Sequence, residues 1–320
     1  MNIQLSEEHI SVMEAARDFA KSELLPGVIE RDEHQKFPGE QIKKMGELGF
    51  MGMMTDPKYG GGGMDTISYV LAMEEISKID SSASVVMSVN NSLVCWGIEK
   101  FGTDFQKEKY LKPLASGQIH GGFCLSEPEA GSDATSQKTT AEDKGDHYLL
   151  NGTKNWITNG NSGTVFLVMA QTHPELKHKG INCLIVEKGM EGFEVGKKED
   201  KLGIRGSDTH SLMFTDVKVP KENRIGEDGF GFKFAMGVLN GGRIGIAAQA
   251  LGIAAGAYEL ALQYSKERKS FGKPISEHQA IQFKLADMAT KIDAARLLVC
   301  LLYTSPSPRD RTRSRMPSSA

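Results

Sequence analysis

The residues best suited to chemistry lie in two short runs, residues 123–133 and 156–160. The first run begins with apolar residues, as a strand does, and then changes to small and polar residues around Pro128 and Gly131. A strand end of this kind turns into a loop that presents backbone N–H groups and hydroxyls. The second run offers an indole ring, the Thr158 hydroxyl and a turn signal behind them. A flat, partly charged cofactor requires these groups, namely an aromatic wall, hydroxyl donors and free amides.

Taken together, the two runs resemble the flavin-binding signatures in the middle domain of the acyl-CoA dehydrogenase family. The resemblance extends from about Leu5 to about Val299, and the short-chain, butyryl-CoA branch is the most similar. Either run alone is also what a plain strand and turn look like, so the identification depends on the pair. The resemblance implies an α+β fold with an N-terminal helical domain, a middle antiparallel β-barrel or sandwich domain, and an incomplete C-terminal helical bundle.

The composition is that of a globular protein with more than one core. The chain has 320 residues, 39% of them apolar and 25% charged, and its formal charge of −3 gives no support to nucleic-acid binding. The four cysteines lack CxxC spacing, which favours reduced thiols in an intracellular protein, and no metal-binding motif is found. The first residues resemble neither a secretory signal nor a mitochondrial presequence, and no run of ~18 apolar residues predicts a membrane span. We expect a cytoplasmic protein of bacterial type, or a mitochondrial matrix protein if the numbering is that of a mature chain.

Apolar periodicity divides the chain into four parts. Residues 1–117 predict an N-terminal helical domain, residues 118–222 a middle β domain, and residues 223–302 a truncated C-terminal helical domain. Residues 303–320 are rich in Ser, Pro and Arg without apolar periodicity, which predicts disorder. Because the helical pattern before this tail has no cap, a cloning, sequencing or frame artefact is favoured over a natural basic tail.

Three local patterns within these parts predict particular structures. Asn151-Gly152 follows a strand-like run and predicts a hairpin turn. The proline-free stretch 229–268 predicts one long helix whose glycines require close packing of another helix or of a ligand. Residues 88–92 are polar within an apolar helix, and they either bond to backbone groups or line an acyl pocket.

The family resemblance implies FAD as the cofactor and assigns its contacts residue by residue. The first run would hold the isoalloxazine and the pyrophosphate, with Ser126 and Ser132 as hydroxyl donors. Trp156, which alone would be read as a core residue, would pack against the ring system, and the Thr158 hydroxyl would lie near N5. The cofactor-binding residues implied here are Phe123, Cys124, Leu125, Ser126, Gly131, Ser132, Trp156, Ile157 and Thr158.

Three later residues match contacts to the adenine end of FAD. Arg268 and Phe271 match residues that reach the FAD of a neighbouring subunit, which implies a homotetramer, and Gln279 matches a further contact. An arginine is suited to a pyrophosphate because its planar fork binds at two points. Outside this context, Arg268 would be read as a cation at a helix end and Gln279 as a solvated helix position.

The acyl-CoA substrate is implied to contact Ser132 and a second group, Asn240, Gly241, Gly242 and Arg243. Arg243 would lie in the cleft near the thioester or CoA, and a charge among glycines in an apolar helix requires a partner. Close relatives usually carry aspartate at the position of Asn240, so the role of Asn240 is open.

The implied reaction is the α,β-dehydrogenation of a short-chain acyl-CoA to trans-2-enoyl-CoA, with electrons passed to an electron-transfer flavoprotein. A carboxylate removes the α-proton while hydride leaves to the flavin. In the short-chain branch this glutamate lies in a late helix beyond the present sequence, and Gly242 occupies the position that some other relatives use. No catalytic residue is therefore assigned, and negligible activity is expected, because loss of a general base costs ~10²–10⁴-fold.

Two other functions fit the same residues. One is an acyl-CoA oxidase-like flavoenzyme that hands its electrons to oxygen. The other is a catalytically dead relative that binds FAD or CoA, which the missing base would favour.

Overall fold

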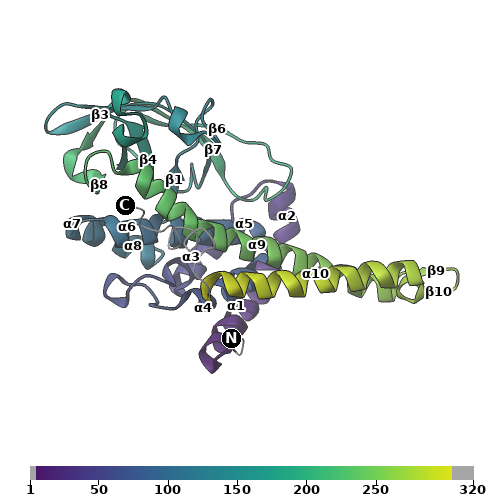
Figure 1. Cartoon of the computed structure of the whole chain (residues 1–320). Coiled ribbons are helices and arrows are strands. Elements are labelled where there is room, and N and C mark those ends of the chain that lie inside the picture. The colour runs from purple at the N-terminus through teal and green to yellow at the C-terminus, as the bar shows by residue number, and fades with distance from the viewer. Residues whose placement is uncertain (1–4, 305–320) are drawn as a thin grey trace, which may run out of the picture.

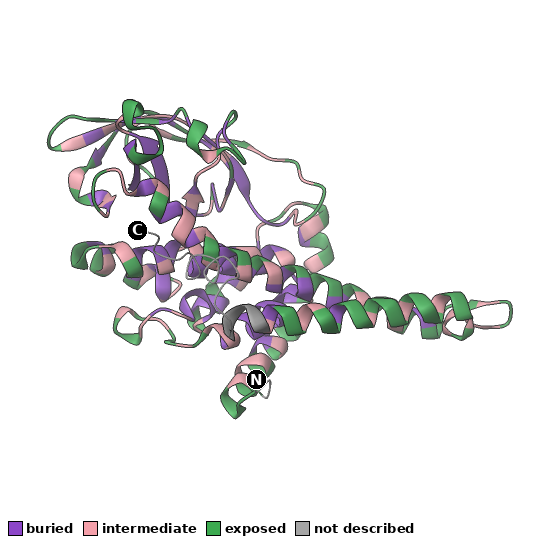
Figure 2. Cartoon of the chain, in the orientation of Figure 1, coloured by how far each residue is buried: buried purple, intermediate pink, exposed green. Residues whose placement is uncertain are grey.

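The computed structural model describes residues 5–304, and it shows a β domain lying on a layer of helices from which a helical hairpin extends (Figure 1). This arrangement confirms the predicted α+β fold. The predicted tail lies outside the described residues from position 305 onward, whereas residues 303 and 304 still belong to the last helix. Figure 2 shows that the hairpin is the most exposed part of the molecule, whereas the strands and the central helices are largely buried.

The N-terminal part is helical, as its apolar spacing predicts. Ser6 caps the first helix by accepting a hydrogen bond from the amide of His9. The helices are α1 (Glu7–Phe19), α2 (Val28–Glu33), α3 (Gly39–Glu47), α4 (Thr66–Ser77), α5 (Ser81–Ser88), α6 (Trp96–Phe101), α7 (Asp104–Gln106) and α8 (Lys112–Ala115). Three π-helical segments continue these helices: Ala20–Leu24 extends α1, Val89–Cys95 joins α5 to α6, and Lys107–Leu111 joins α7 to α8.

The middle part is a sheet of eight strands. The strands are β1 (Gly121–Cys124), β2 (Thr140–Asp143), β3 (His147–Thr158), β4 (Val165–Gln171), β5 (Ile181–Glu187), β6 (Phe193–Lys198), β7 (Thr209–Pro220) and β8 (Arg224–Ile225). They follow the order β6-β7-β3-β2-β4-β5-β8, and β1 pairs with β4. Most pairs are antiparallel, but β1 and β2 each run parallel to β4, to which the chain returns through longer connections.

The hairpin predicted at Asn151-Gly152 is wrong, because both residues lie inside β3. The strand instead continues through a register shift between Leu150 and Gly152, where Gly152 adopts φ 144°. A Cβ at Gly152 would lie 2.5 Å from the Thr139 hydroxyl, so glycine is needed for close approach. The turn lies earlier, between β2 and β3, and includes Gly145.

The C-terminal part consists of two long helices joined by a small two-stranded ribbon. They are α9 (Gly231–Glu267), β9 (Lys269–Ser270), β10 (Lys273–Pro274) and α10 (Gln279–Thr304). Within residues 5–304, α9 is the one helix long and apolar enough to cross a membrane, a property that core helices of globular proteins share. Here α9 packs on α4, α5 and the π-helical segment before α6.

The glycines of α9 allow its backbone to touch its neighbours, as the sequence predicts. A Cβ at Gly252 would lie 2.4 Å from the carbonyl oxygen of Glu74, and one at Gly256 would lie 2.3 Å from that of Lys78. By contrast, a Cβ at Gly237, on the same helix, would have no atom within 4 Å. The α4–α9 contact is therefore one of backbone against backbone.

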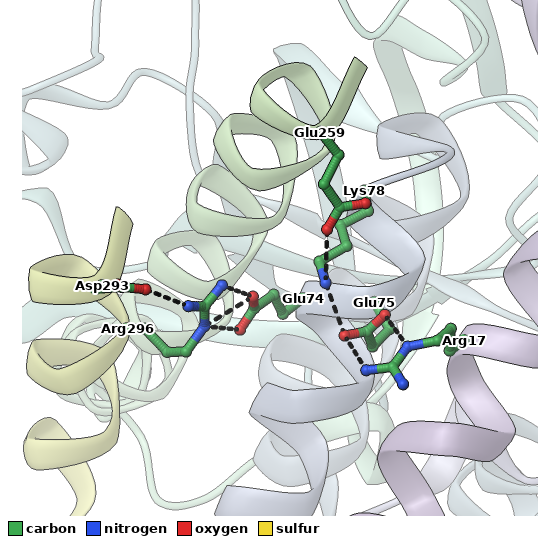
Figure 3. A network of polar contacts seen from close by, with 7 residues as sticks. All are labelled: Arg17, Glu74, Glu75, Lys78, Glu259, Asp293 and Arg296. Atoms are coloured by element: carbon green, nitrogen blue, oxygen red, sulfur yellow. Dashed lines mark hydrogen bonds and ion pairs between the residues drawn. The ribbon is translucent and has the colours of Figure 1, made fainter. Parts of the chain in front are cut away.

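Charged side chains hold the outer helices to α4 (Figure 3). Glu74 accepts hydrogen bonds from Arg296 of α10, the shortest of them 2.7 Å. Its neighbour Glu75 accepts from Arg17 of α1 at 3.0 Å and from Lys78 at 2.9 Å. Both carboxylates are buried, so α1 and α10 are each anchored through an ion pair that water screens poorly.

The close approach at Gly252 predicts a contrast between two identical substitutions. Gly252→Ala should lower the free energy of unfolding by about 1–3 kcal/mol, because the methyl group cannot displace a helix backbone. Gly237→Ala should raise it by roughly 0.5–1 kcal/mol through helix propensity. Urea unfolding of both variants measures this, and equal effects would contradict the packing described.

The ion pairs of Glu75 predict a dependence of stability on acid. Burial alone would raise the pKa of Glu75, but its bonds to Arg17 and Lys78 outweigh burial and lower it. A lowered folded-state pKa adds stability that is present above the unfolded value of about 4.3 and is lost as pH falls through the folded-state pKa. Glu75→Gln should therefore lower the melting temperature at pH 7 and flatten its fall below pH ~5, whereas exposed Glu191→Gln should change neither.

Candidate functional site

The first predicted run leaves the sheet at the end of β1 and forms a surface loop. Phe123 and Cys124 belong to β1, where Cys124 is fully buried and Phe123 packs partly against the core between sheet and helices. Leu125 and Ser126 are half-buried, and Gly131 and Ser132 lie exposed beyond a tight turn closed by paired hydrogen bonds between Glu127 and Ala130. The loop therefore presents its hydroxyls and amides to solvent, as predicted.

The second run lies in β3, directly beside the loop. The pairing of β3 with β7 shifts by one residue between Lys154 and Ile157, which is a β-bulge. Within the bulge Trp156 has φ 61° and its side chain is 60% exposed. Ile157 is buried and Thr158 half-buried. A large exposed indole in a left-handed conformation is costly unless a ligand covers it.

The backbone joins the two runs. The amide of Asn155, in the bulge, donates to the carbonyl of Ser126 at 2.9 Å. This bond brings together the two runs that the sequence assigns to the cofactor in this region: Phe123, Cys124, Leu125, Ser126, Gly131, Ser132, Trp156, Ile157 and Thr158. The side chains of Cys124 and Ile157 belong to the core of the β domain, so only their backbone could meet a ligand.

A buried ion pair beneath the loop was missed by sequence reasoning. The Nζ of Lys154 lies 2.6 Å from Oε1 of Glu127, and both side chains are buried. Burial lowers the pKa of Lys154, and its carboxylate partner opposes this. Burial alone would raise the pKa of Glu127. Its contacts with Lys154 and with two backbone amides outweigh burial, so the pKa of Glu127 is lowered. Glu127 lies between Ser126 and Pro128, and Lys154 between Thr153 and Asn155, so no apolar surroundings in the sequence mark either charge as buried.

The polar residues 88–92 bond to backbone groups, which was one of the two alternatives. The side chain of Asn90 donates to the carbonyls of Met51 and Leu114 and accepts from the amide of Gly121, the first residue of β1. Asn91 makes three similar bonds, to Met53, Phe50 and Met87. Asn90 therefore fixes the start of the strand from which the loop departs, whereas Asn91 links segments of the helical part.

The predicted substrate group lies on α9, below the sheet. Gly242 is buried against Leu93, whereas Asn240 and Arg243 are exposed and hydrogen-bonded to each other, and Gly241 lies between them. The reasoning that Arg243 is a buried charge in need of a partner is wrong, because it faces solvent, one turn away from Asn240. An exposed guanidinium remains free to meet an anionic ligand.

The residues assigned to the adenine end lie apart from the rest. Arg268 ends α9, Phe271 is 95% exposed between β9 and β10, and exposed Gln279 begins α10. All three lie at the far end of the extended hairpin, away from β3 (Figure 1). Within one chain they do not contribute to the site around Trp156.

A hollow of about 440 Å³ lies elsewhere, between α2, the start of α5 and residues 204–206. Arg31, Asp32 and Asp80 are among its lining residues, and none of the predicted site residues is. Within residues 5–304 no cluster of three His, Cys, Asp or Glu side chains could hold a metal ion.

Comparison with known proteins matches each part of the chain to one family. Family models for the N-terminal, middle and C-terminal domains of acyl-CoA dehydrogenase match residues 6–118, 122–217 and 229–312. A short-chain specific acyl-CoA dehydrogenase of Clostridium acetobutylicum is 47% identical over 93% of this chain and 79% of its own. Related chains include mitochondrial short-chain enzymes as well.

Solved structures give the same result. The butyryl-CoA dehydrogenase of Megasphaera elsdenii is 46% identical, with a TM-score of 0.92 over 95% of this chain and 80% of its own. A chain from a structure described as the electron transferring flavoprotein of Acidaminococcus fermentans is 51% identical. Its TM-score is also 0.92, over 93% of this chain and 79% of its own.

The contacts of Asn90 predict a strong effect of its removal. Asn90→Ala should leave three buried backbone groups of Met51, Leu114 and Gly121 without partners and lower the free energy of unfolding by at least about 2 kcal/mol. Exposed Asn240→Ala should change it by less than about 0.5 kcal/mol. Chemical denaturation measures both, and a small effect at Asn90 would show that β1 is held by other contacts.

Proposed function

Because the chain belongs to the acyl-CoA dehydrogenase family, we propose that it forms the FAD-binding part of an enzyme that converts short-chain acyl-CoA thioesters to trans-2-enoyl-CoA in fatty-acid oxidation. Its relatives are short-chain and butyryl-CoA dehydrogenases. The observation that carries the proposal is the exposed Trp156 in its β-bulge, beside a loop whose hydroxyls and amides face outward.

The residues present fit an FAD. The indole of Trp156 is 60% exposed, and Gly131, in the loop joined to its strand, has no atom within 4 Å of a Cβ position. A flat ring and an open loop are therefore both accessible to a ligand. Ser126 and Ser132 would donate to the cofactor, and Thr158 would bond to its ring near the hydride-accepting atom. When bound, FAD supplies the two-electron acceptor for the reaction.

The protein's own groups position the substrate. Ser132 and the Asn240–Arg243 turn of α9 are proposed to contact the acyl-CoA, with the exposed Arg243 meeting its negative charge. The α-proton is proposed to leave to a carboxylate, and none of the residues assigned above is given that role. The hairpin residues Arg268, Phe271 and Gln279 are proposed to reach the FAD of a second subunit in a homotetramer, since they extend away from the site of their own chain.

The partner of the reduced flavin is proposed to be an electron-transfer flavoprotein. The 51% identity to a chain from the electron transferring flavoprotein structure of A. fermentans supports this. The protein is proposed to act in the cytoplasm of a bacterium, with the mitochondrial matrix as the alternative. An oxidase-like enzyme or a dead FAD or CoA binder remains the alternative function.

Trp156→Ala should weaken FAD binding about three- to tenfold, the effect of the ~0.5–1.5 kcal/mol that a stacked aromatic contributes. The melting temperature of the FAD-free protein should not change, since the indole is exposed. Flavin content after gel filtration and a fluorescence titration with FAD measure this. Phe105→Ala, which removes another exposed aromatic ring, is the control, and unchanged flavin content in Trp156→Ala would contradict the proposed contact.

The reaction itself is tested by adding butyryl-CoA without oxygen. The FAD-loaded 320-residue chain should keep its oxidised flavin spectrum, whereas a chimera continued after Val299 with the C-terminal part of the M. elsdenii enzyme should be bleached. Electron-transfer flavoprotein should then restore the spectrum faster than air does. Faster reoxidation by air would favour the oxidase alternative, and an unbleached chimera would favour the dead binder.

A further inference from the structure

The buried pair of Glu127 and Lys154 lies at the crossing of the two runs that form the FAD site. Its two side chains are 3% and 0% exposed, and none of the roles assigned above uses them. Removing a charge from water costs several kcal/mol per ion, so a buried ion pair needs compensating contacts.

Lys154 uses all three of its ammonium protons. Besides Oε1 of Glu127 at 2.6 Å, its Nζ reaches the carbonyl of Leu125 at 3.2 Å and Oε1 of Gln137 at 3.2 Å. Leu125 precedes the loop and Gln137 ends it. A single side chain of β3, two residues before Trp156, therefore holds both ends of the loop.

Glu127 closes the loop from the other side. Its carboxylate accepts hydrogen bonds from the amides of Lys138 and Thr139, the latter at 3.1 Å. Between these points residues 128–136 are mostly exposed and polar, so few apolar contacts can define their shape. Within the loop Asp133 accepts hydrogen bonds from Thr135 and Ser136, and the contacts of Glu127 and Lys154 attach this unit to the sheet.

We propose that Glu127 and Lys154 are positioning residues, which fix the 128–137 loop against the Trp156 bulge so that the FAD site is formed before the cofactor binds. This inference rests on the proposed binding of FAD. Neither residue touches the reacting atoms. Both act indirectly, because they fix the amides and hydroxyls of the loop in position relative to the indole of Trp156.

The test separates positioning from simple stability with single and double variants. Lys154→Met leaves the carboxylate of Glu127 buried without its counter-charge, which should lower the melting temperature and weaken FAD binding by about tenfold or more. Glu127→Gln/Lys154→Met removes both charges, which often restores stability because no charge is left unpaired. If the pair positions the loop, the double variant should regain its melting temperature but still bind FAD about tenfold more weakly.

A control pair of similar burial lies in the helical part. Arg31 and Asp80 are 3.0 Å apart, with side chains 10% and 4% exposed, and the side-chain hydrogen bonds that they make go to Leu24, Pro26, Ser82, Ala83 and each other, not to the loop or to β3. Arg31→Met/Asp80→Asn should change stability without changing the affinity of the folded protein for FAD. A double variant at Glu127 and Lys154 that binds FAD within twofold of the unaltered chain would overturn the proposal.

Amide hydrogen exchange gives a readout that needs no cofactor. In the FAD-free protein the Glu127→Gln/Lys154→Met variant should lose protection at the hydrogen-bonded amides of Glu127, Ala130, Lys138, Thr139 and Asn155, whereas the control pair should leave these amides unchanged. If the unaltered chain binds no FAD, the proposed function fails, and the positioning role is then judged on exchange alone. Unchanged protection at these amides would overturn it.

Discussion

The contact between α4 and α9 is the constraint on which the rest of the structure depends. Glycines at 252 and 256 let the two helices approach until backbone meets backbone, and this leaves no room for a side chain between them. α9 then passes beneath the sheet at one end and into the hairpin at the other (Figure 1). The adjacent carboxylates of α4, Glu74 and Glu75, anchor α10 and α1 to the same support. One helix pair thus fixes the distance between the β domain and the hairpin.

On this support the site is assembled from backbone geometry more than from side-chain packing. Asn90, in the π-helical segment after α5, fixes the start of β1, and β1 delivers the chain to the loop. The bulge in β3 then exposes Trp156 while its neighbours Lys154 and Ile157 both point inward. A flavin requires such a rigid, open surface with polar groups at its edge, and the fold supplies it where the bulge interrupts β3.

Much of this could be predicted from the sequence, and the failures have physical causes. The start of the first helix could be predicted because Ser6 is a favoured N-cap residue. The close packing at Gly252 could be predicted because glycine weakens a helix unless a neighbour packs closely on it. The Asn151-Gly152 turn failed because tertiary pairing with β7 extended the strand through it. The burial of Arg243 was inferred from its apolar neighbours in sequence, but on a helix those neighbours occupy other faces. The Glu127–Lys154 pair joins residues far apart in sequence, and no periodicity marks such a contact.

The hydrogen bond from Asn155 to Ser126 has a consequence for how such sites change during evolution. It joins the amide of one residue to the carbonyl of the other, so it makes no demand on either side chain. Both positions are free to vary without loosening the link, provided that the bulge keeps its extra residue. Any constraint on Ser126 comes from its proposed bond to the cofactor and not from this link, which an alignment would record only in the spacing of the strand.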